Sequence, residues 1–395
     1  MKNSFFRFCL AACISLFSPA CSNTEKLQGN EFLVEGKLSG VEDGIVVRIG
    51  RVDGMVSLPV KLDTVMNGRF TLRGEAESDL EQLEISAYGK DIAPYPLYVW
   101  VMPGAKVKIK GKGKIIPLWD VKSSVPYQKE ENRFINNKRD LIIERSRISL
   151  NRNELFEKIA AASSEEEAAE YRHISNNILL KEIMQLSEED LFWDMSTMEK
   201  MDISPVWLKK MQHITQFIRV YDNLRPKVWE LFGRMSEEDK NTPYGTQIIA
   251  ALTPYNVVGV GDNIADANLL DINGNTKRLS DYLDKYLLLD FWSLGCGPCI
   301  MAFPTMKEIS ETYRDKLTII SISIDPDAIW KKAMDMHNTP WVNLRDPNLW
   351  SGLSASYGVL AIPNYVMISP EGKIIDTWAG FSEGFLKMKV SENIN

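Results

Sequence analysis

The stretch LLLDFWSLGCGPCIMAFP, residues 287–304, decides the fold of the last third of this chain. The apolar run that ends at Trp292 predicts a buried strand, and the turn after it leads into a helix. Cys296 would lie at the N-terminus of that helix, exposed at the end of the sheet, where backbone N–H groups and the helix dipole favour a thiolate. Cys299 lies one turn later on the inner side, where it can attack a mixed disulfide formed at Cys296. The stretch therefore predicts a redox-active dithiol.

The composition is that of an acidic globular protein with more than one domain. The chain has 395 residues, of which 45% are hydrophobic and 25% are charged, and its formal net charge is −7. This length exceeds that of one ordinary domain, and the share of apolar residues excludes wholesale disorder. Because the net charge is negative and no segment is strongly basic apart from short lysine runs, the sequence argues against nucleic-acid binding.

The first 20 residues predict an export signal. Lys2 and Arg7 precede an apolar run, residues 8–17, that is too short to span a membrane. The small residues before Cys21 resemble a bacterial lipobox, which would make Cys21 the lipid-modified first residue of the mature protein; Ser18 departs from the usual leucine. The same residues also fit ordinary signal-peptidase cleavage, which would release a soluble protein. We favour the lipoprotein, because a free cysteine at a mature N-terminus is a liability in an oxidising space.

The cysteine count limits the remaining thiol chemistry to one pair. Cys9 and Cys13 leave with the signal and Cys21 is acylated, so that only Cys296 and Cys299 remain. A disulfide between residues three apart closes too small a loop to add much stability, which leaves redox exchange or metal binding. A zinc site needs two more ligands at short spacing. The histidines are scattered along the chain, at His173, His213 and His337. We therefore predict redox exchange, without a metal or a cofactor.

Three regions follow the signal. Residues 31–115 contain short alternating runs separated by Gly, Asn-Gly and Pro-Gly turn signals, which predict an antiparallel, sandwich-like all-β domain. Residues 126–252 show apolar residues at helical spacing and predict an α-helical connector. Residues 257–395 alternate strand and helix and end in a hairpin, which predicts an α/β domain with a mixed sheet. Neither of the first two regions shows a cluster of catalytic residue types.

Residues 257–395 resemble the thioredoxin-fold modules of the TlpA/ResA type, the membrane-anchored thiol–disulfide oxidoreductases of bacterial envelopes. FWSLGCGPC matches their redox motif, YGVLAIPNYVMISPEGKI their proline loop, and NLLDINGNTKRLSDY their additional N-terminal hairpin. The segment LDTVMNGRFTLRG resembles a β-rich domain of unknown function that often precedes such modules. The resemblance implies a thioredoxin fold for the last third of the chain, and disulfide exchange as its activity.

The resemblance also implies roles for individual residues. Cys296 is the attacking nucleophile and Cys299 resolves the mixed disulfide. Asp290 matches the buried acid of thioredoxins and would accept the proton of Cys299 if burial raises its own pKa. Pro363 matches the cis-proline, which brings backbone beside the dithiol and leaves its carbonyl side for pairing with a substrate chain.

Three residues depart from the family pattern. Gly295 stands where most relatives have tryptophan, so that the recognition surface lacks an aromatic ring. Ala302 replaces a glutamate found in many relatives, and Ala361 replaces a glycine of the proline loop. These changes leave the substrate and the rate of exchange open.

Two functions from different classes compete. The first is an envelope thiol–disulfide oxidoreductase that acts on protein thiols and disulfides. The Gly-Pro dipeptide between its cysteines favours the reducing direction, because thioredoxin has a potential of about −270 mV and the oxidant DsbA about −120 mV. The resemblance implies recharging by a membrane donor of the CcdA/DsbD kind. The second is a non-enzymatic envelope lipoprotein, in which the first two regions bind a partner and the thioredoxin module has weakened.

Overall fold

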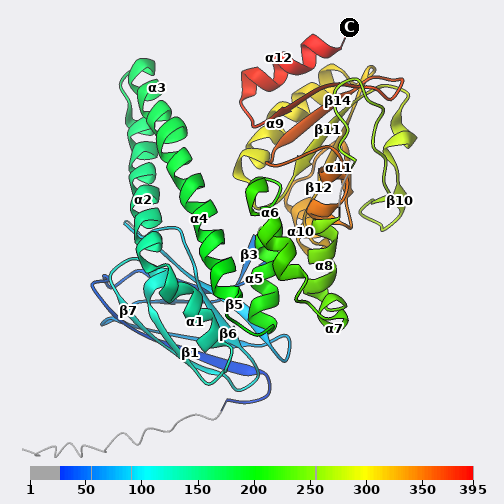
Figure 1. The fold of residues 1–395 in the computed structure, drawn as a ribbon. Helices are drawn as coiled ribbons and strands as arrows, with labels where there is room; N and C mark the ends of the chain where they lie inside the picture. The colour runs from blue at the N-terminus through cyan, green and yellow to red at the C-terminus, as the bar shows by residue number, and fades with distance from the viewer. Residues whose placement is uncertain (1–26, 55, 90, 254–255, 395) are drawn as a thin grey trace, which may run out of the picture.

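The computed structural model describes residues 27–54, 56–89, 91–253 and 256–394. A β-rich region comes first, a set of helices follows it, and an α/β domain lies at the C-terminus (Figure 1). The export signal and Cys21 lie outside the described residues.

The N-terminal region is a sandwich of two four-stranded sheets, ordered β4-β1-β7-β8 and β3-β2-β5-β6. Buried and outward side chains alternate along β1 and β7, as in β1, where Phe32, Val34 and Leu38 are buried. The strands are β1 (Glu31–Ser39), β2 (Val46–Asp53), β3 (Val56–Thr64), β4 (Arg69–Glu75), β5 (Glu81–Tyr88), β6 (Leu97–Val101), β7 (Lys106–Lys112) and β8 (Asp120–Ser123). The predicted sheet-rich domain is confirmed.

One pairing in this sandwich departs from the antiparallel prediction. Strands β1 and β7 pair in parallel, with Val34 opposite Val107. Parallel neighbours need a long crossover connection. The chain supplies one here, because it builds β4 and all four strands of the second sheet between β1 and β7.

The helices that follow share a hydrophobic core with the sandwich, so that they are more than a connector. Phe134, Met195 and Trp207 of the helices are buried in one cluster with strand residues such as Val99. Helices α2, α3 and α4 form an arm that stands away from the sheets (Figure 1). The helices are α1 (Gln128–Asn137), α2 (Arg139–Ala161), α3 (Glu165–His173), α4 (Leu180–Met198), α5 (Pro205–Thr215), α6 (Arg225–Phe232), α7 (Glu237–Lys240) and α8 (Pro243–Leu252).

A buried carboxylate links two of these helices to each other and to the sandwich: Glu131 of α1 pairs with Lys210 of α5 and is hydrogen-bonded to β5 and β6. The Glu131 carboxylate lies 2.9 Å from Lys210 Nζ and accepts hydrogen bonds from Trp100 Nε1 at 3.0 Å and Gln82 Nε2 at 2.8 Å. Desolvation acts to raise the pKa of Glu131, but Lys210 and these donors outweigh it and lower the pKa. The carboxylate therefore stays charged inside the protein.

Replacing Lys210 with alanine should lower the free energy of unfolding by about 3–5 kcal/mol, because the Glu131 charge would remain buried without its cation. Guanidinium denaturation followed by tryptophan fluorescence measures this change. The Lys210→Met/Glu131→Gln pair removes both charges and should recover most of the loss. Equal stability of Lys210→Ala and the native chain would contradict this account of the interface.

The C-terminal domain is built on one mixed sheet of order β10-β9-β13-β12-β11-β14-β15. Strands β11, β12 and β13 are parallel, β14 pairs antiparallel with β11, and β15 pairs antiparallel with β14. The strands are β9 (Leu269–Leu270), β10 (Thr276–Lys277), β11 (Tyr286–Trp292), β12 (Leu317–Ser323), β13 (Val342–Arg345), β14 (Asn364–Ile368) and β15 (Ile374–Ala379). This mixed sheet with helices is the predicted thioredoxin-like fold.

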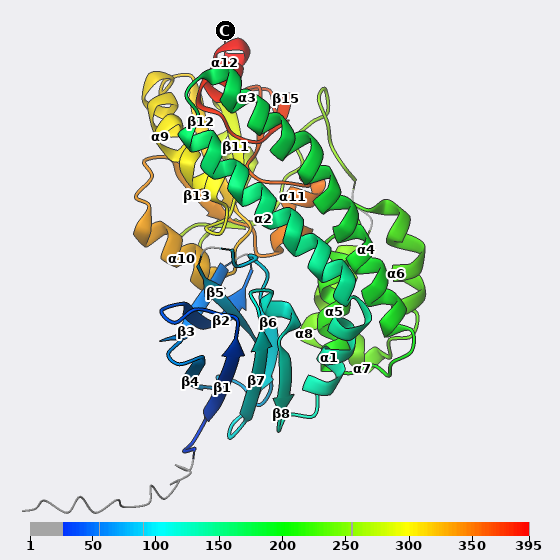
Figure 2. The same cartoon turned by 90° about the vertical axis from the view of Figure 1, so that its left-hand side faces the viewer.

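Helices cover both faces of the sheet, so that β11 is buried from Leu287 to Trp292. Helices α9 (Gly297–Thr312), α10 (Asp327–Met336) and α12 (Glu383–Asn393) pack on one face, and α11 (Leu353–Ser356) packs on the other. In Figure 2 this domain lies above the sandwich, with α10 nearest to it.

Candidate active site

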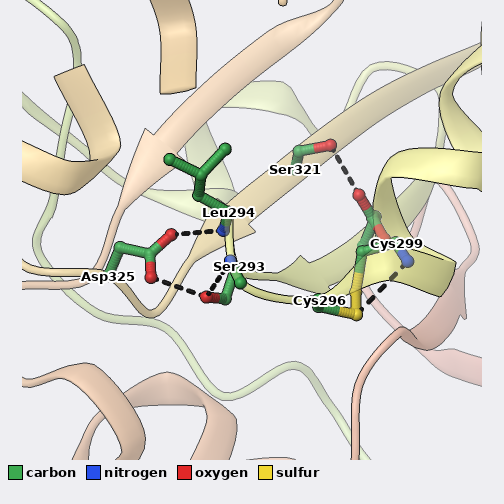
Figure 3. The surroundings of a disulfide bond; sticks show 8 residues. Ser293, Leu294, Cys296, Cys299, Ser321 and Asp325 are labelled. Atoms are coloured by element: carbon green, nitrogen blue, oxygen red, sulfur yellow. Dashed lines mark hydrogen bonds between the residues drawn. A yellow bond between two sulfur atoms is a disulfide. The ribbon is translucent and has the colours of Figure 1, made fainter. Parts of the chain in front are cut away.

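The cysteine pair lies where β11 gives way to α9. Cys296 is the N-cap of α9, and a disulfide joins it to Cys299 with a Cα–Cα distance of 5.3 Å (Figure 3). The backbone N–H of Cys299 donates a hydrogen bond to Cys296 Sγ at 3.2 Å. The same donor would stabilise a Cys296 thiolate in the reduced protein.

Cys296 is less exposed than predicted. Its exposed fraction is 6%, against 1% for Cys299, and both belong to the apolar cluster that also contains Trp292 and Phe303. The prediction of an exposed nucleophile was wrong for this oxidised form, because Cys296, at the start of α9, packs within this cluster.

Asp290 lies beneath the cysteine-bearing helix. Leu288 and Trp292, two residues to either side on β11, belong to the same cluster as Cys299, so that the strand alternation places Asp290 on that face as well. The side chain is 1% exposed. Burial raises the pKa of Asp290 to about 7, although the Ser321 hydroxyl donates a hydrogen bond to its Oδ2 at 2.8 Å and acts against the rise. The carboxyl group can therefore gain and lose a proton near neutral pH.

The neighbours of Asp290 were not identified from the sequence. Ser321 on β12 and Tyr365 on β14 are its direct cross-strand partners. Trp341 Nε1 donates to Ser321 Oγ at 2.8 Å, so that the proton of the serine hydroxyl is free to point at Asp290. Burial raises the pKa of Tyr365, which keeps its phenol neutral. The signal that could have revealed Ser321 is the pair of alternating serines, Ser321 and Ser323, at the end of the apolar run LTIISIS, residues 317–323.

A second buried acid lies behind the turn that precedes Cys296. Asp325 is 0% exposed, and its carboxylate accepts hydrogen bonds from Ser293 Oγ at 2.6 Å, Leu294 N at 2.7 Å and Ser323 Oγ at 3.2 Å (Figure 3). From the sequence, Asp325 and Pro326 only mark the start of the next helix. The structure thus adds a residue that the sequence did not single out.

The loop that contains Pro363 packs against the apolar cluster that includes both cysteines. The Ile362–Pro363 peptide bond is cis, and Ile362 packs against the cluster that contains both cysteines. The Pro363 carbonyl accepts a hydrogen bond from Gly380 N at 2.8 Å. The suggestion that this carbonyl is left for substrate pairing was therefore wrong, because Gly380, the residue that follows β15, already donates to it.

The three departures from the family pattern lie in different environments. Ala302 is fully buried in the cluster, where its methyl group packs, whereas Gly295 and Ala361 are exposed. A glutamate at position 302 would need a hydrogen-bonding partner in this apolar core.

Metal ligands and membrane spans are absent from the described part of the chain. Within residues 27–394, apart from the four undescribed positions, no three His, Cys, Asp or Glu side chains gather to hold a metal ion. No helix in those same ranges is both long and apolar enough to cross a membrane.

Residues 260–377 match the AhpC/TSA family. A thioredoxin-like protein YneN of Bacillus subtilis is 27% identical over 124 residues, which are 30% of this chain and 71% of that protein. The thiol–disulfide oxidoreductase ResA of Geobacillus thermodenitrificans is 27% identical over 124 residues, 31% of this chain and 70% of that protein. The solved thioredoxin domain of a thiol–disulfide oxidoreductase from Bacteroides vulgatus is 26% identical, covers 35% of this chain and 99% of that chain, and has a TM-score of 0.32. The C-terminal domain of this chain is thus a thioredoxin-like domain of the AhpC/TSA family, related in sequence to thiol–disulfide oxidoreductases.

Proposed function

We propose that this chain reduces disulfides of protein substrates in the bacterial envelope through the Cys296–Cys299 dithiol. The observation that carries the proposal is the cysteine pair at the start of α9, with a backbone N–H aimed at Cys296 Sγ and a carboxyl group of pKa about 7 beneath it. A dithiol and a base titrating near neutral pH are what two-step disulfide exchange requires.

The proposed reaction transfers two electrons in two steps. The Cys296 thiolate attacks one sulfur of a substrate disulfide, which forms a mixed disulfide and releases the other substrate sulfur as a thiolate. The Asp290 carboxylate takes the proton from the Cys299 thiol, and the resulting thiolate attacks Cys296 Sγ. The second substrate thiolate leaves, and the protein holds the Cys296–Cys299 disulfide. An external dithiol must then reduce the protein for the next turnover.

The proposed direction, donor and location rest on sequence features. The Gly-Pro dipeptide between the cysteines supports a reductant with a potential nearer about −270 mV than about −120 mV. A membrane donor of the CcdA/DsbD kind would recharge it, and a lipid anchor at Cys21 would hold it at the membrane. The small residues before Cys21 support this anchor.

A second candidate function is a non-enzymatic binding module. The low exposure of Cys296 and the alanine at position 302 favour it. On this alternative the disulfide is structural, and the helices and sandwich bind a partner.

Insulin-disulfide reduction in the presence of dithiothreitol separates the two functions. The proposed oxidoreductase should accelerate insulin precipitation, and the Cys296→Ser/Cys299→Ser variant should not. Equal rates with the native chain, with the double variant and without protein would favour the binding module.

A further inference from the structure

We propose that Asp325 is a positioning residue for Cys296, which fixes the turn from Ser293 to Gly295 that carries the nucleophile. The proposal rests on the proposed disulfide exchange and deepens it by assigning a role to a second acid. This role differs from that of Asp290, because Asp325 binds the turn in front of the helix and Asp290 lies on the strand beneath it.

The hydrogen bonds run from Asp325 to Cys296 in two steps. Ser293 Oγ and Leu294 N each donate to one oxygen of the Asp325 carboxylate, at 2.6 and 2.7 Å. Ser293 in turn accepts from Gly295 N through its hydroxyl, at 3.2 Å, and from Cys296 N through its carbonyl, at 3.0 Å. Figure 3 shows this turn between Asp325 and the disulfide. The carboxylate therefore holds the residues that set where Cys296 Sγ lies.

The turn depends on such support. Gly295 has no side chain to pack, and glycine adds conformational freedom to the backbone. Cys296 Sγ receives the N–H of Cys299 only while the turn keeps the sulfur at the helix N-terminus. Charge-assisted hydrogen bonds to a buried carboxylate are among the stronger ones in proteins. Asp325 can therefore restrict the backbone of the turn, as the packing of a bulky side chain at position 295 would otherwise do.

The N-terminal sandwich reaches the same carboxylate. A Cβ atom placed on Gly54, which has a φ of +59°, would lie 2.7 Å from Pro326 Cδ and 3.7 Å from Asp325 Oδ1. Gly54 lies between β2 and β3, and Figure 2 shows the upper ends of these strands below α10. The sandwich thus packs on the segment that holds Asp325, and it supports the active-site turn from the side opposite Cys296.

Two titratable groups next to the cluster that contains the cysteines are separate from Asp325. Asp290 lies on the sheet beneath the helix, and the His337 ring contacts the Phe303 ring with a centroid distance of 5.4 Å. None of the variants below changes either group.

The test measures the pKa of Cys296 in the reduced full chain, in which Cys299→Ser prevents the disulfide from forming. Iodoacetamide alkylates the thiolate, and mass spectrometry of the Cys296 peptide gives the alkylation rate at each pH. Asp325→Asn can accept only one of the two bonds from the turn, and Ser293→Ala loses both bonds of the hydroxyl. Each should raise the pKa by about one unit, which is about a tenfold loss of thiolate. Ser323→Ala is the matched control: like Ser293→Ala it removes two hydrogen bonds, one to the Asp325 carboxylate and one from Asp325 N, but it removes none within the turn, and it should leave the pKa of Cys296 unchanged.

A fall of the Cys296 pKa in Asp325→Asn, with no change in Ser293→Ala, would overturn the proposal, because the carboxylate would then act through its charge. An equal rise in Ser323→Ala would also overturn it. If Asp325→Asn does not fold, Ser293→Ala decides alone. Alkylation of Cys296 does not require disulfide exchange. A native chain that is inactive with insulin would therefore contradict the proposed function, whereas the alkylation experiment separately decides whether Asp325 positions Cys296.

Gly54→Ala tests the contribution of the sandwich. Its Cβ would displace Pro326, and we expect the Cys296 pKa to rise by a smaller amount than in Ser293→Ala. Gly104→Ala is the matched control, because Gly104 has a φ of +79° in the same sandwich with no atom within 4 Å of the added Cβ. Equal pKa values in the two alanine variants would remove the sandwich from the support of the turn.

Discussion

Replacing Cys296 with serine should reduce insulin reduction to the rate seen without protein, whereas replacing Cys299 should stop the reaction after its first step. A serine hydroxyl is a far weaker nucleophile than a thiolate at neutral pH, so that Cys296→Ser cannot form the mixed disulfide. Cys299→Ser keeps the attacking sulfur and its helix-terminal position, but nothing then attacks the mixed disulfide. The second variant should therefore accumulate covalent adducts with its substrates.

Non-reducing electrophoresis of the two variants, after incubation with envelope extracts, measures this difference. Cys299→Ser should give reductant-sensitive bands of higher mass, and mass spectrometry of each band should place the link at Cys296. The double serine variant is the control for non-covalent association. Adducts formed equally by both single variants would show that the two cysteines do not have distinct roles.

Asp290→Asn should slow exchange at neutral pH by about 10²–10⁴-fold, which is the usual contribution of a general base. The asparagine keeps the shape of the side chain and its contact with Ser321, but it cannot take the proton of Cys299. Because the pKa of Asp290 is raised to about 7 by burial, the native rate should rise with pH through about 7. The variant should lack this inflection. Stopped-flow measurement of the resolving step between pH 5 and 9 gives both profiles, and identical profiles would exclude Asp290 from proton transfer.

The same substitution should stabilise the protein above pH 7. The ordinary pKa of the carboxyl group is 3.8, and burial raises it to about 7 in the folded chain. Protonation therefore favours the folded state: this stability is fully present below pH ~4 and is lost as the pH rises to about 7. Above that pH the buried charge lowers the free energy of unfolding by up to about 4 kcal/mol, because each unit of pKa shift corresponds to about 1.36 kcal/mol. Asp290→Asn avoids this cost, and chemical denaturation at pH 8 should show a more stable variant. A less stable variant at pH 8 would contradict the burial of a charged Asp290.

The parts of the fold that could be predicted are those with local signals. The apolar run before the cysteines predicted β11. The Asn67-Gly68 signal correctly marked a tight turn, which a Met66–Arg69 bridge closes, but the strands that it joins, β3 and β4, belong to different sheets and form no hairpin. The parallel pairing of β1 and β7 could not be predicted, because register between strands about 70 residues apart leaves no mark in either strand. The shared core of helices and sandwich depends on the same kind of distant contact.

In the candidate active site, too, the residues with local sequence signals could be predicted and those from distant segments could not. Cys296, Cys299 and Asp290 lie within ten residues of each other, and their spacing indicates their chemistry directly. The hydrogen bonds to this region come from β12 and the segment that follows it: Ser321 reaches Asp290 across 31 residues, and Asp325 reaches Ser293 across 32. The exposure of Cys296 depends on the packing of α9 against the sheet, which a motif does not specify. Motifs thus predicted the groups that we propose to react, whereas the groups that we propose to position them could be found only in the structure.

Equilibration of the full chain in dithiothreitol redox buffers, with the Cys296–Cys299 disulfide quantified by mass spectrometry, tests the central claim most directly. An oxidoreductase of the proposed kind should show a reversible two-electron transition with a midpoint nearer about −270 mV than about −120 mV. A disulfide that does not open and reform reversibly in these buffers, or a midpoint near about −120 mV, would contradict the proposal of a protein-disulfide reductant.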